Sequence, residues 1–311
     1  MTGIVSPLPK STPTSGATRP ITVLAQLYRL WASVAAQTIL PVLASWMPPS
    51  VTGLLPGRGS SDSAIMQQFQ LERAHFFNVK ASGLVLDLRK CFNFIRWSLG
   101  IPLIRQCGVP FELVQQWALS LAQLHRVWQI KGNIFEAGST SRGFPEGDAM
   151  SVVVVVCLAG LWCCFVAHRC NSTALSLSAY ADNWSWSLTD HSMHPCAMES
   201  TLTILQKEGL TIDWTKTWYW VTHSSDAAFV SQLLTPFAPV DQLRRRSSAP
   251  DLGFQTQYTK KARLGIISDR IESGLNALLD FPFCHMASPS RNTWFVPLFF
   301  HACFMELNVG Q

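Results

Sequence analysis

Apolar and small polar residues alternate along residues 175–188, which read LSLSAYADNWSWSL. A period of two is typical of half-buried strands, and it continues on both sides of Asp182 and Asn183. An Asp-Asn pair favours a tight turn. The pattern therefore predicts a β-hairpin with a carboxylate at its tip.

Helical spacing of apolar residues predicts three further segments. Residues 19–44 form the first, with Pro20 near its start, where helices tolerate proline. A second helix is expected after the cap candidate Ser61 or Asp62. The third, MESTLTILQKE, is expected to end at Gly209.

Short apolar runs and turn residues complete the outline. GLVLDL at 83–88 reads as a buried strand, and LTIDWTKTWYWV at 210–221 alternates as a strand does. Residues 50–62 and 143–147 are turn-rich loops, and 238–257 read as a linker or exposed loop. Strands and helices interleave without a strict βαβ rhythm, which favours an α+β fold.

Composition allows a folded core. The chain has 311 residues, of which 48% are hydrophobic and 14% charged, unlike a disordered protein. This length fits two globular units or one large body with subdomains. The net charge of +5 is a mild indication of a polyanionic partner.

The nine cysteines lie mostly in hydrophobic runs and are expected to be reduced core residues. Cys163, His168 and Cys170 are a possible metal set, but their apolar setting favours the core. Residues 152–167 form the only run apolar enough to suggest a membrane span, and a buried helix is the preferred interpretation. The N-terminus lacks the apolar stretch of a signal peptide.

Asp87 and Asp182 are acids at the ends of apolar strands, where packing gives no reason for a charge. Each alone could cap the next helix or turn. Together, carboxylates on adjacent strands could hold two Mg²⁺ ions, which prefer oxygen ligands.

The order of motifs along the chain resembles that of the reverse-transcriptase domain of non-LTR (LINE-like) retrotransposons. The resemblance is good over residues 4–225 and looser beyond them. The similar segments, in chain order, are IVSPLPKS with RPITVLAQLYRLW, GLLPGRGSSDSAI, LVLDLRKCFNFI, GFPEGDAMS, AYADNWSW (the YADD hairpin) and GLTIDWTKTWYWV. The resemblance implies a right-hand polymerase fold: fingers at 1–80, palm at 81–225, a connection at 226–257 and a partial thumb at 258–311.

The resemblance also implies roles in the chemistry. Asp87 and Asp182 would bind Mg²⁺, or Mn²⁺, with the Leu88 carbonyl as a further ligand. Phe92 would lie under the sugar of the incoming nucleotide and exclude a 2′-hydroxyl, although it could equally be a core residue. Lys216 would protonate the departing pyrophosphate, or could be an exposed strand residue.

Four more residues are implied to contact the nucleotide or template. Arg19 would grip the triphosphate with help from Lys10, since both pair well with phosphate. Either could instead be a solvated surface charge. Gly143 and Gly147 would let the main chain approach a base pair, although glycines in any turn look alike.

Two residues depart from the family pattern. Asn183 replaces the second aspartate of YADD, so the affinity for a second ion should fall. Glu146 replaces a glutamine, and its charge would repel a triphosphate unless protonated or paired with a base such as Arg142. These changes leave open a catalytically impaired protein that binds nucleic acid without synthesis.

The expected function is therefore an RNA-directed DNA polymerase core, with an RNA template, a DNA primer and deoxynucleotide triphosphates as partners. The chain is expected to be part of a larger polyprotein, intracellular in the cytoplasm or nucleus, with no membrane association. A membrane-associated structural protein built around 152–167 is a third possibility, but it explains none of the ordered motifs.

Overall fold

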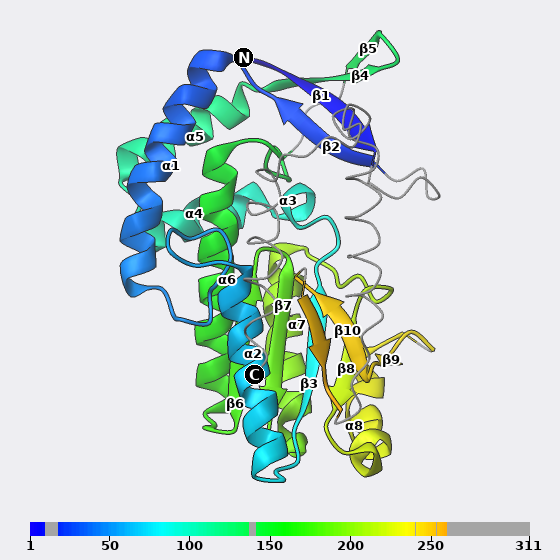
Figure 1. Cartoon of the computed structure of the whole chain (residues 1–311). Coiled ribbons are helices and arrows are strands. Elements are labelled where there is room, and N and C mark those ends of the chain that lie inside the picture. Colours follow the sequence, from blue (N-terminus) through cyan, green and yellow to red (C-terminus); the bar gives the residue numbers. More distant parts are fainter. Residues whose placement is uncertain (10–17, 137–140, 240, 253, 260–311) are drawn as a thin grey trace, which may run out of the picture. The chain divides into compact units, whose positions relative to one another are not determined.

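The computed structural model describes residues 1–9, 18–136, 141–239, 241–252 and 254–259 (Figure 1). They all belong to the first of two compact units, Met1–Arg263 and Leu264–Gln311. The described α-helices are α1 (Gln26–Trp46), α2 (Ser60–Phe76), α3 (Cys91–Phe94), α4 (Trp97–Gln106), α5 (Phe111–Ala122), α6 (Ala149–Cys170), α7 (His194–Glu208) and α8 (Ala227–Leu234). The described strands are β1 (Thr2–Pro9), β2 (Thr18–Val23), β3 (Ser82–Asp87), β4 (His125–Ile130), β5 (Asn133–Glu136), β6 (Leu175–Tyr180), β7 (Asn183–Leu188), β8 (Trp218–Val221), β9 (Arg244–Arg245), β10 (Ser248–Asp251) and β11 (Phe254–Gln257).

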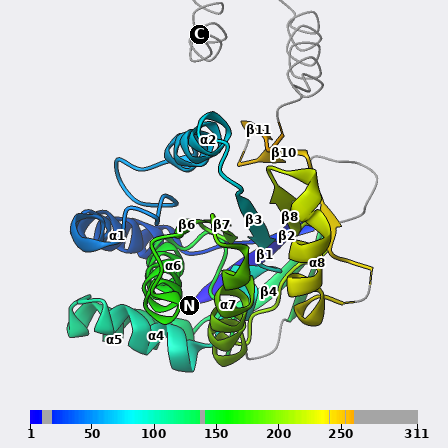
Figure 2. The ribbon, with the colours of Figure 1, turned by 90° about the horizontal axis from the view of Figure 1, so that it is seen from below.

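A five-stranded sheet with the order β6-β7-β3-β8-β9 forms the centre of the fold. Strand β3 pairs antiparallel with β7 on one side and β8 on the other. Helices α6 and α7 lie on one face, whereas α2 and the β10–β11 hairpin lie on the other (Figure 2). Because side chains alternate across a strand, Leu84 and Leu86 enter the core beneath α6, and Val85 packs with the α2 side.

Helix α6 is the buried helix that the sequence predicts at 152–167. An 18-residue window of it is apolar enough to cross a membrane, but 72% of that window is buried inside the protein. The expectation of a single such segment is wrong, because α1 also passes by length and composition, with only 28% buried. Helix α1 accordingly exposes Leu27, Leu30, Val34 and Val42 to solvent.

The start of α6 is held by one buried carboxylate, Asp148. Its Oδ1 accepts from the Met150 amide at 3.1 Å, which caps the helix. Its Oδ2 accepts from Trp117 Nε1 at 2.9 Å and from the Tyr28 hydroxyl at 3.1 Å. Asp148 thus joins α5 and α1 to the first turn of α6.

The loop between α1 and α2 packs against the bend of the β6–β7 hairpin. The guanidinium of Arg58 donates to the carbonyls of Ala44 and Met47, which end α1, and to two more in the loop. Gly53 lies against the bend of the hairpin, where a Cβ would come within 2.5 Å of the Ala181 amide nitrogen. Only glycine permits this contact.

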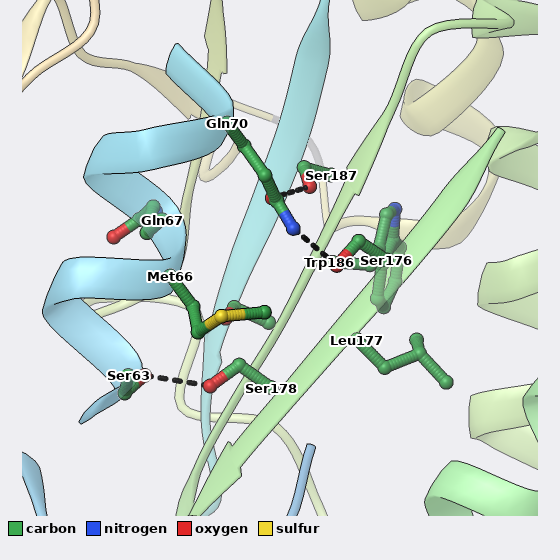
Figure 3. Close-up of a pocket in the computed structure, with 10 residues that line it drawn as sticks. Ser63, Met66, Gln67, Gln70, Ser176, Leu177, Ser178, Trp186 and Ser187 are labelled. Atoms are coloured by element: carbon green, nitrogen blue, oxygen red, sulfur yellow. Dashed lines mark hydrogen bonds between the residues drawn. The ribbon is translucent and has the colours of Figure 1, made fainter. Parts of the chain in front are cut away.

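Helix α2 contacts the sheet partly through a polar seam (Figure 3). The hydroxyls of Ser63 and Ser178 are 2.6 Å apart. The Gln70 amide donates to Ser176 and accepts from Ser187 at 2.5 Å. The residual cavity between them is only about 20 Å³, room for a single water.

A second sheet, with the order β2-β1-β4-β5, contains the N-terminal strands. Strand β1 pairs antiparallel with β2 and parallel with β4. The Thr22 amide in β2 donates to the Glu146 carbonyl at 2.7 Å. This bond ties the second sheet to the loop that precedes α6.

Several sequence predictions give the correct type of element, although some of the exact bounds differ. The hairpin, the strand at 83–88 and the helix ending at Gly209 are confirmed, and Gly209 has a φ of +71° at the helix end. The hairpin turn is Ala181 and Asp182 rather than Asp182 and Asn183, because Asn183 already pairs in β7. The cap of α2 is Gly59, whose amide donates to Asp62 at 2.6 Å.

Three predicted segments are wrong in part. The helix expected from residue 19 begins at Gln26, because Thr18–Val23 pairs with β1. The strand expected at 210–221 is only Trp218–Val221, since the Asp213 carboxylate holds a turn before it. The linker expected at 238–257 contains three strands, and Ala249 within it is buried.

Substituting Asp148 tests its role as the joint between helices. In Asp148→Asn, the new amide nitrogen faces either the Met150 amide or the two donors Trp117 and Tyr28. In both cases a buried donor loses its acceptor, which costs about 1–3 kcal/mol. We expect the free energy of unfolding in urea to fall by about 2–4 kcal/mol. Asp190→Asn, which changes an exposed cap, should shift it by less than about 0.5 kcal/mol. Equal effects would contradict this role.

Candidate active site

The register between β3 and β7 brings together the predicted acids. Asp87 at the end of β3 lies directly opposite Asn183, the first residue of β7. The Leu88 amide donates to the Asp182 carbonyl at 2.8 Å, so the two chains remain paired past the strand end. Asp87 and Asp182, 95 positions apart in the sequence, are therefore neighbours at one edge of the central sheet.

The bend of the hairpin holds Asp182 outward. Ala181 has a φ of +52°, which is unusual for alanine and characteristic of a tight turn. Its carbonyl accepts from Trp184 Nε1 at 3.1 Å, and the Trp184 ring stacks on Trp162 of α6. A core tryptophan thus anchors the turn, while the Asp182 side chain is exposed.

Lys216 supplies a positive charge to this site. Its Nζ lies 2.8 Å from Asp87 Oδ1 and 3.7 Å from Asp213 Oδ2. A turn before β8 places it there, held by the Asp213 amide, which donates to the Asp87 carbonyl at 2.8 Å. The site therefore contains three carboxylates, those of Asp87, Asp182 and Asp213, around one ammonium group.

The pKa values reflect partial burial and this ion pair. Burial raises the pKa of Asp87, and the hydrogen bond and charge of Lys216 counteract that rise. Burial acts to lower the pKa of Lys216, but Asp87 raises it above its ordinary value. The carboxylate and the ammonium stabilise each other's charged forms.

Asn183 makes a contact that the sequence did not indicate. Its side-chain Nδ2 donates to Asp251 Oδ1 at 3.0 Å, on β10. Burial raises the pKa of Asp251 to about 6, and the hydrogen bond from Asn183 opposes this. The residue replacing the second acid of the hairpin is thus paired with another acid.

Phe92 and Glu146 belong to one unit formed by α3 and the loop before α6. The Phe144 amide donates to the Phe92 carbonyl at 2.7 Å. The Glu146 carboxylate accepts from Asn93 Nδ2 at 2.5 Å, so a neutral amide is one of its partners. The Phe92 side chain is partly buried against the main core.

The two loop glycines have packing reasons within the protein. Gly143 has a φ of +79°, and a Cβ there would come within 2.6 Å of the Asn93 carbonyl oxygen. Gly147 has a φ of +111°, and its Cβ would meet the Thr22 carbonyl oxygen at 2.8 Å. Both therefore bring this loop close to the chain's own backbone, whatever else they contact.

Of the two remaining predicted nucleotide contacts, the structure describes Arg19, which lies on the second sheet. Arg19 is exposed on β2, opposite Leu8 of β1. Lys10 lies outside the described residues. The structure therefore brings together Asp87, Asp182, Asn183 and Lys216, and places Arg19 on a separate sheet.

The donor set at the sheet edge fits a hard divalent cation. Asp87 and Asp182 offer carboxylate oxygens, and the Lys216 ammonium already lies where a positive charge is favoured. Across the described part of the chain, no group of three or more His, Cys, Asp or Glu side chains is arranged to hold a metal ion. Water and substrate phosphates would have to complete the coordination.

Cys163, His168 and Cys170, all within the described residues, do not form a metal set. The seven described cysteines carry free thiols. Cys91, Cys157, Cys163 and Cys170 are buried, as the core interpretation expects. That interpretation is wrong for Cys164, which is exposed, and holds only in part for the half-buried Cys107 and Cys196.

Three residues that complete the site were not predicted from the sequence, namely Asp213, Asp251 and Asn93. Asp213 lies three positions before Lys216 and could have been found from that spacing. Asp251 lay in a segment interpreted as a linker, and no local pattern connects it to Asn183. Asn93 follows Phe92 directly and carries no signal of its contact with the loop.

Comparison with known proteins identifies the class. The family model described as reverse transcriptase (RNA-dependent DNA polymerase) matches residues 8–255, more than half of the chain. The chain therefore belongs to the reverse transcriptase family. Among curated protein sequences, none matches it significantly.

Solved structures agree on the fold. Apo telomerase from Candida tropicalis, truncated from its C-terminal domain, superposes with a TM-score of 0.58 at 11% identity, covering 82% of this chain and 53% of that one. Telomerase from Candida albicans, in complex with a TWJ fragment of telomeric RNA, gives 0.55 at 11% identity, covering 82% and 45%. The chain thus spans about half the length of these telomerases. The predicted right-hand polymerase fold is confirmed, while the expected thumb lies almost entirely outside the described residues.

Removing the ammonium should change the titration of Asp87. In Lys216→Met, both the hydrogen bond and the charge that lower the pKa of Asp87 are lost, so we expect this pKa to rise. Carbon-13 NMR of labelled aspartate carboxyl groups across a pH series measures it. Lys207→Met, at an exposed position on α7, should leave the Asp87 titration unchanged. An unaltered Asp87 pKa in Lys216→Met would contradict the ion pair.

Proposed function

We propose that this chain is the catalytic core of an RNA-directed DNA polymerase that extends a primer 3′-hydroxyl on an RNA template. The observation that carries the proposal is the β3–β7 register, which sets Asp87 opposite Asn183 and beside Asp182. Two carboxylates at a sheet edge, with a lysine ion-paired to one of them, match the needs of phosphoryl transfer. That reaction depends mainly on positioning and charge neutralisation.

Mg²⁺, or Mn²⁺, would be held by Asp87, Asp182 and the main-chain carbonyl of Leu88. When bound, such ions supply activation of the attacking oxygen and stabilisation of the leaving phosphate. Asp87 is oriented for this by the hydrogen bond from Lys216, and Asp182 by the turn that Trp184 anchors. Both are backbone-paired and so need little reorganisation.

The other proposed roles follow the chemistry of each side chain. Lys216 would deliver a proton to the departing pyrophosphate, since it is a charged donor already at the site. Arg19, with Lys10, would bind the triphosphate, because guanidinium and ammonium groups pair well with phosphate oxygens. Phe92 would exclude a 2′-hydroxyl, and the loop carrying Gly143 and Gly147 would contact the template.

We further propose that the chain derives from a non-LTR retrotransposon and acts inside the cell on RNA template, DNA primer and deoxynucleotide triphosphates. The support is the ordered series of motifs from IVSPLPKS to GLTIDWTKTWYWV. The telomerase structures share the fold at 11% identity, which does not distinguish this origin from others.

A second candidate function is binding of an RNA–DNA hybrid without synthesis. Asn183 favours it, because the hairpin lacks one carboxylate that the family pattern contains. Glu146 favours it too, because it adds a negative charge beside Asn93 in the loop before α6. Hybrid binding without extension would select this function over the first.

A primer-extension assay decides between them. We expect the chain to extend a DNA primer on RNA template with Mg²⁺ or Mn²⁺, and Asp87→Asn or Asp182→Asn to lower the rate by at least about 100-fold. Asp190→Asn, on an exposed turn away from these acids, should retain the parent rate. Equal rates in all four proteins would remove Asp87 and Asp182 from the mechanism.

Phe92 makes a separate prediction on sugar selection. In Phe92→Val the smaller side chain should admit a 2′-hydroxyl, so the preference for deoxy- over ribonucleotides should fall by about 10–100-fold. Competing single-nucleotide incorporation measures the ratio of kcat/KM values. Phe94→Val, two positions further along the same helical turn, should leave the ratio unchanged. Unaltered selectivity in Phe92→Val would assign Phe92 to the core alone.

A further inference from the structure

Asp251 is a buried acid that no step of the proposed reaction uses. It ends β10 and is 7% exposed, and β10 lies on the face of the central sheet that also carries α2 (Figure 2). Its neighbours on that face include buried Ala249 and Tyr258, whose ring stacks on Trp220. A carboxylate in such a setting requires a donor, because burying an unpaired charge is costly.

The side chain of Asn183 is one such donor, at 3.0 Å from Asp251 Oδ1, and the backbone amide of Leu252 is another. Alternation in β7 explains why it points there: Trp184 and Trp186 enter the core beneath α6, so Asn183 faces the opposite side. Asp87, directly opposite Asn183 in the register, shares that face. Asn183 therefore lies between the acid of β3 and the acid of β10.

Hydrogen-bond chemistry makes the two positions dependent on each other. An ionised carboxylate only accepts, so the partner of Asp251 must donate. An asparagine donates through Nδ2 and has its Oδ1 directed elsewhere, whereas an ionised aspartate at 183 has nothing to donate. Two carboxylates at about 3 Å would repel each other.

We propose that Asp251 is a positioning residue of the active site, which acts by fixing the amide of Asn183, and that positions 183 and 251 form a matched pair. The catalytic consequence rests on the proposed function. Asp251 holds Nδ2 of Asn183, and thereby directs Oδ1 away from itself as a neutral oxygen next to Asp87 and Asp182.

Because of this pairing, restoring the aspartate of the family pattern at position 183 should have different effects with and without a change at position 251. Asn183→Asp alone places a second carboxylate against Asp251, so it should destabilise the protein and should not improve the metal site. Asn183→Asp with Asp251→Asn reverses the direction of the hydrogen bond and keeps it. The double variant also places an acid beside Asp87 and Asp182, as the family pattern has it.

The test uses the 311-residue chain in five forms: the parent, Asn183→Asp, Asp251→Asn, the double variant and Asp251→Ala. We expect Asn183→Asp to lower the Tm by about 3–8 °C and the double variant to recover most of that loss. Asp251→Asn keeps an oxygen acceptor and should lower the Tm less than Asp251→Ala does. A sixth form, Asp241→Asn, changes an exposed acid; it is the control and should not change the Tm.

Mn²⁺ binding, followed by paramagnetic broadening of NMR signals, separates positioning from stability. We expect the affinity for Mn²⁺ to fall about 10-fold in Asp251→Ala and to stay near the parent value in Asp251→Asn. The double variant should bind Mn²⁺ more tightly than the parent, and Asn183→Asp alone should not. A purely structural Asp251 would change the Tm of the variants and leave Mn²⁺ binding by the folded protein unaltered, which would overturn the proposal.

Additive effects of the two substitutions on Tm, or tighter Mn²⁺ binding in Asn183→Asp alone, would also overturn it. Primer extension by the same five proteins keeps the two proposals distinct. If none of them extends a primer while Tm and Mn²⁺ binding remain coupled, the polymerase assignment fails and the Asn183–Asp251 pairing stands. If all extend a primer without such coupling, the pairing fails and the polymerase assignment stands.

Discussion

The antiparallel register between β3 and β7 is the constraint on which the site depends. Because side chains alternate, a shift by one residue would turn Asp87 toward α6 and bring Leu86 to the polar face. The core prevents this shift: Leu84 and Leu86 of β3 and Trp184 of β7 are buried on the α6 side. The energy of apolar packing therefore sets the position of charged groups that contribute little to stability themselves.

Charge at this sheet edge is balanced by contacts from several distant segments. Lys216 neutralises Asp87 from the turn before β8, and Asn183 satisfies Asp251 from the hairpin. Glu146 is similarly satisfied by Asn93 in the loop before α6. Both residues that depart from the family pattern thus have a specific polar partner, so neither substitution leaves an unpaired buried group.

The loops that contain the family-like motifs also make contacts that stabilise the fold. Arg58 in GLLPGRG binds the carbonyls that end α1, and Gly53 lets that loop touch the hairpin. Asp148 in GFPEGD joins three helices through its carboxylate. Residues of these motifs therefore stabilise the fold, in addition to the roles proposed for them in the reaction. Substitutions in them should be interpreted with stability measured alongside activity.

The sequence by itself determined the hairpin at 175–188, the long buried helix α6 and the class of protein. The alternation of apolar and polar residues in 175–188 and the apolar run of α6 are patterns among residues close together in the sequence. Both elements could therefore be predicted without a structure. Only the tertiary structure decided that Thr18–Val23 is a strand, since its partner is β1, and that Asp251 meets Asn183 across 68 positions. Such contacts join residues whose spacing follows no period. They arise from the packing of the hairpin β10–β11 on the sheet, which no local pattern records.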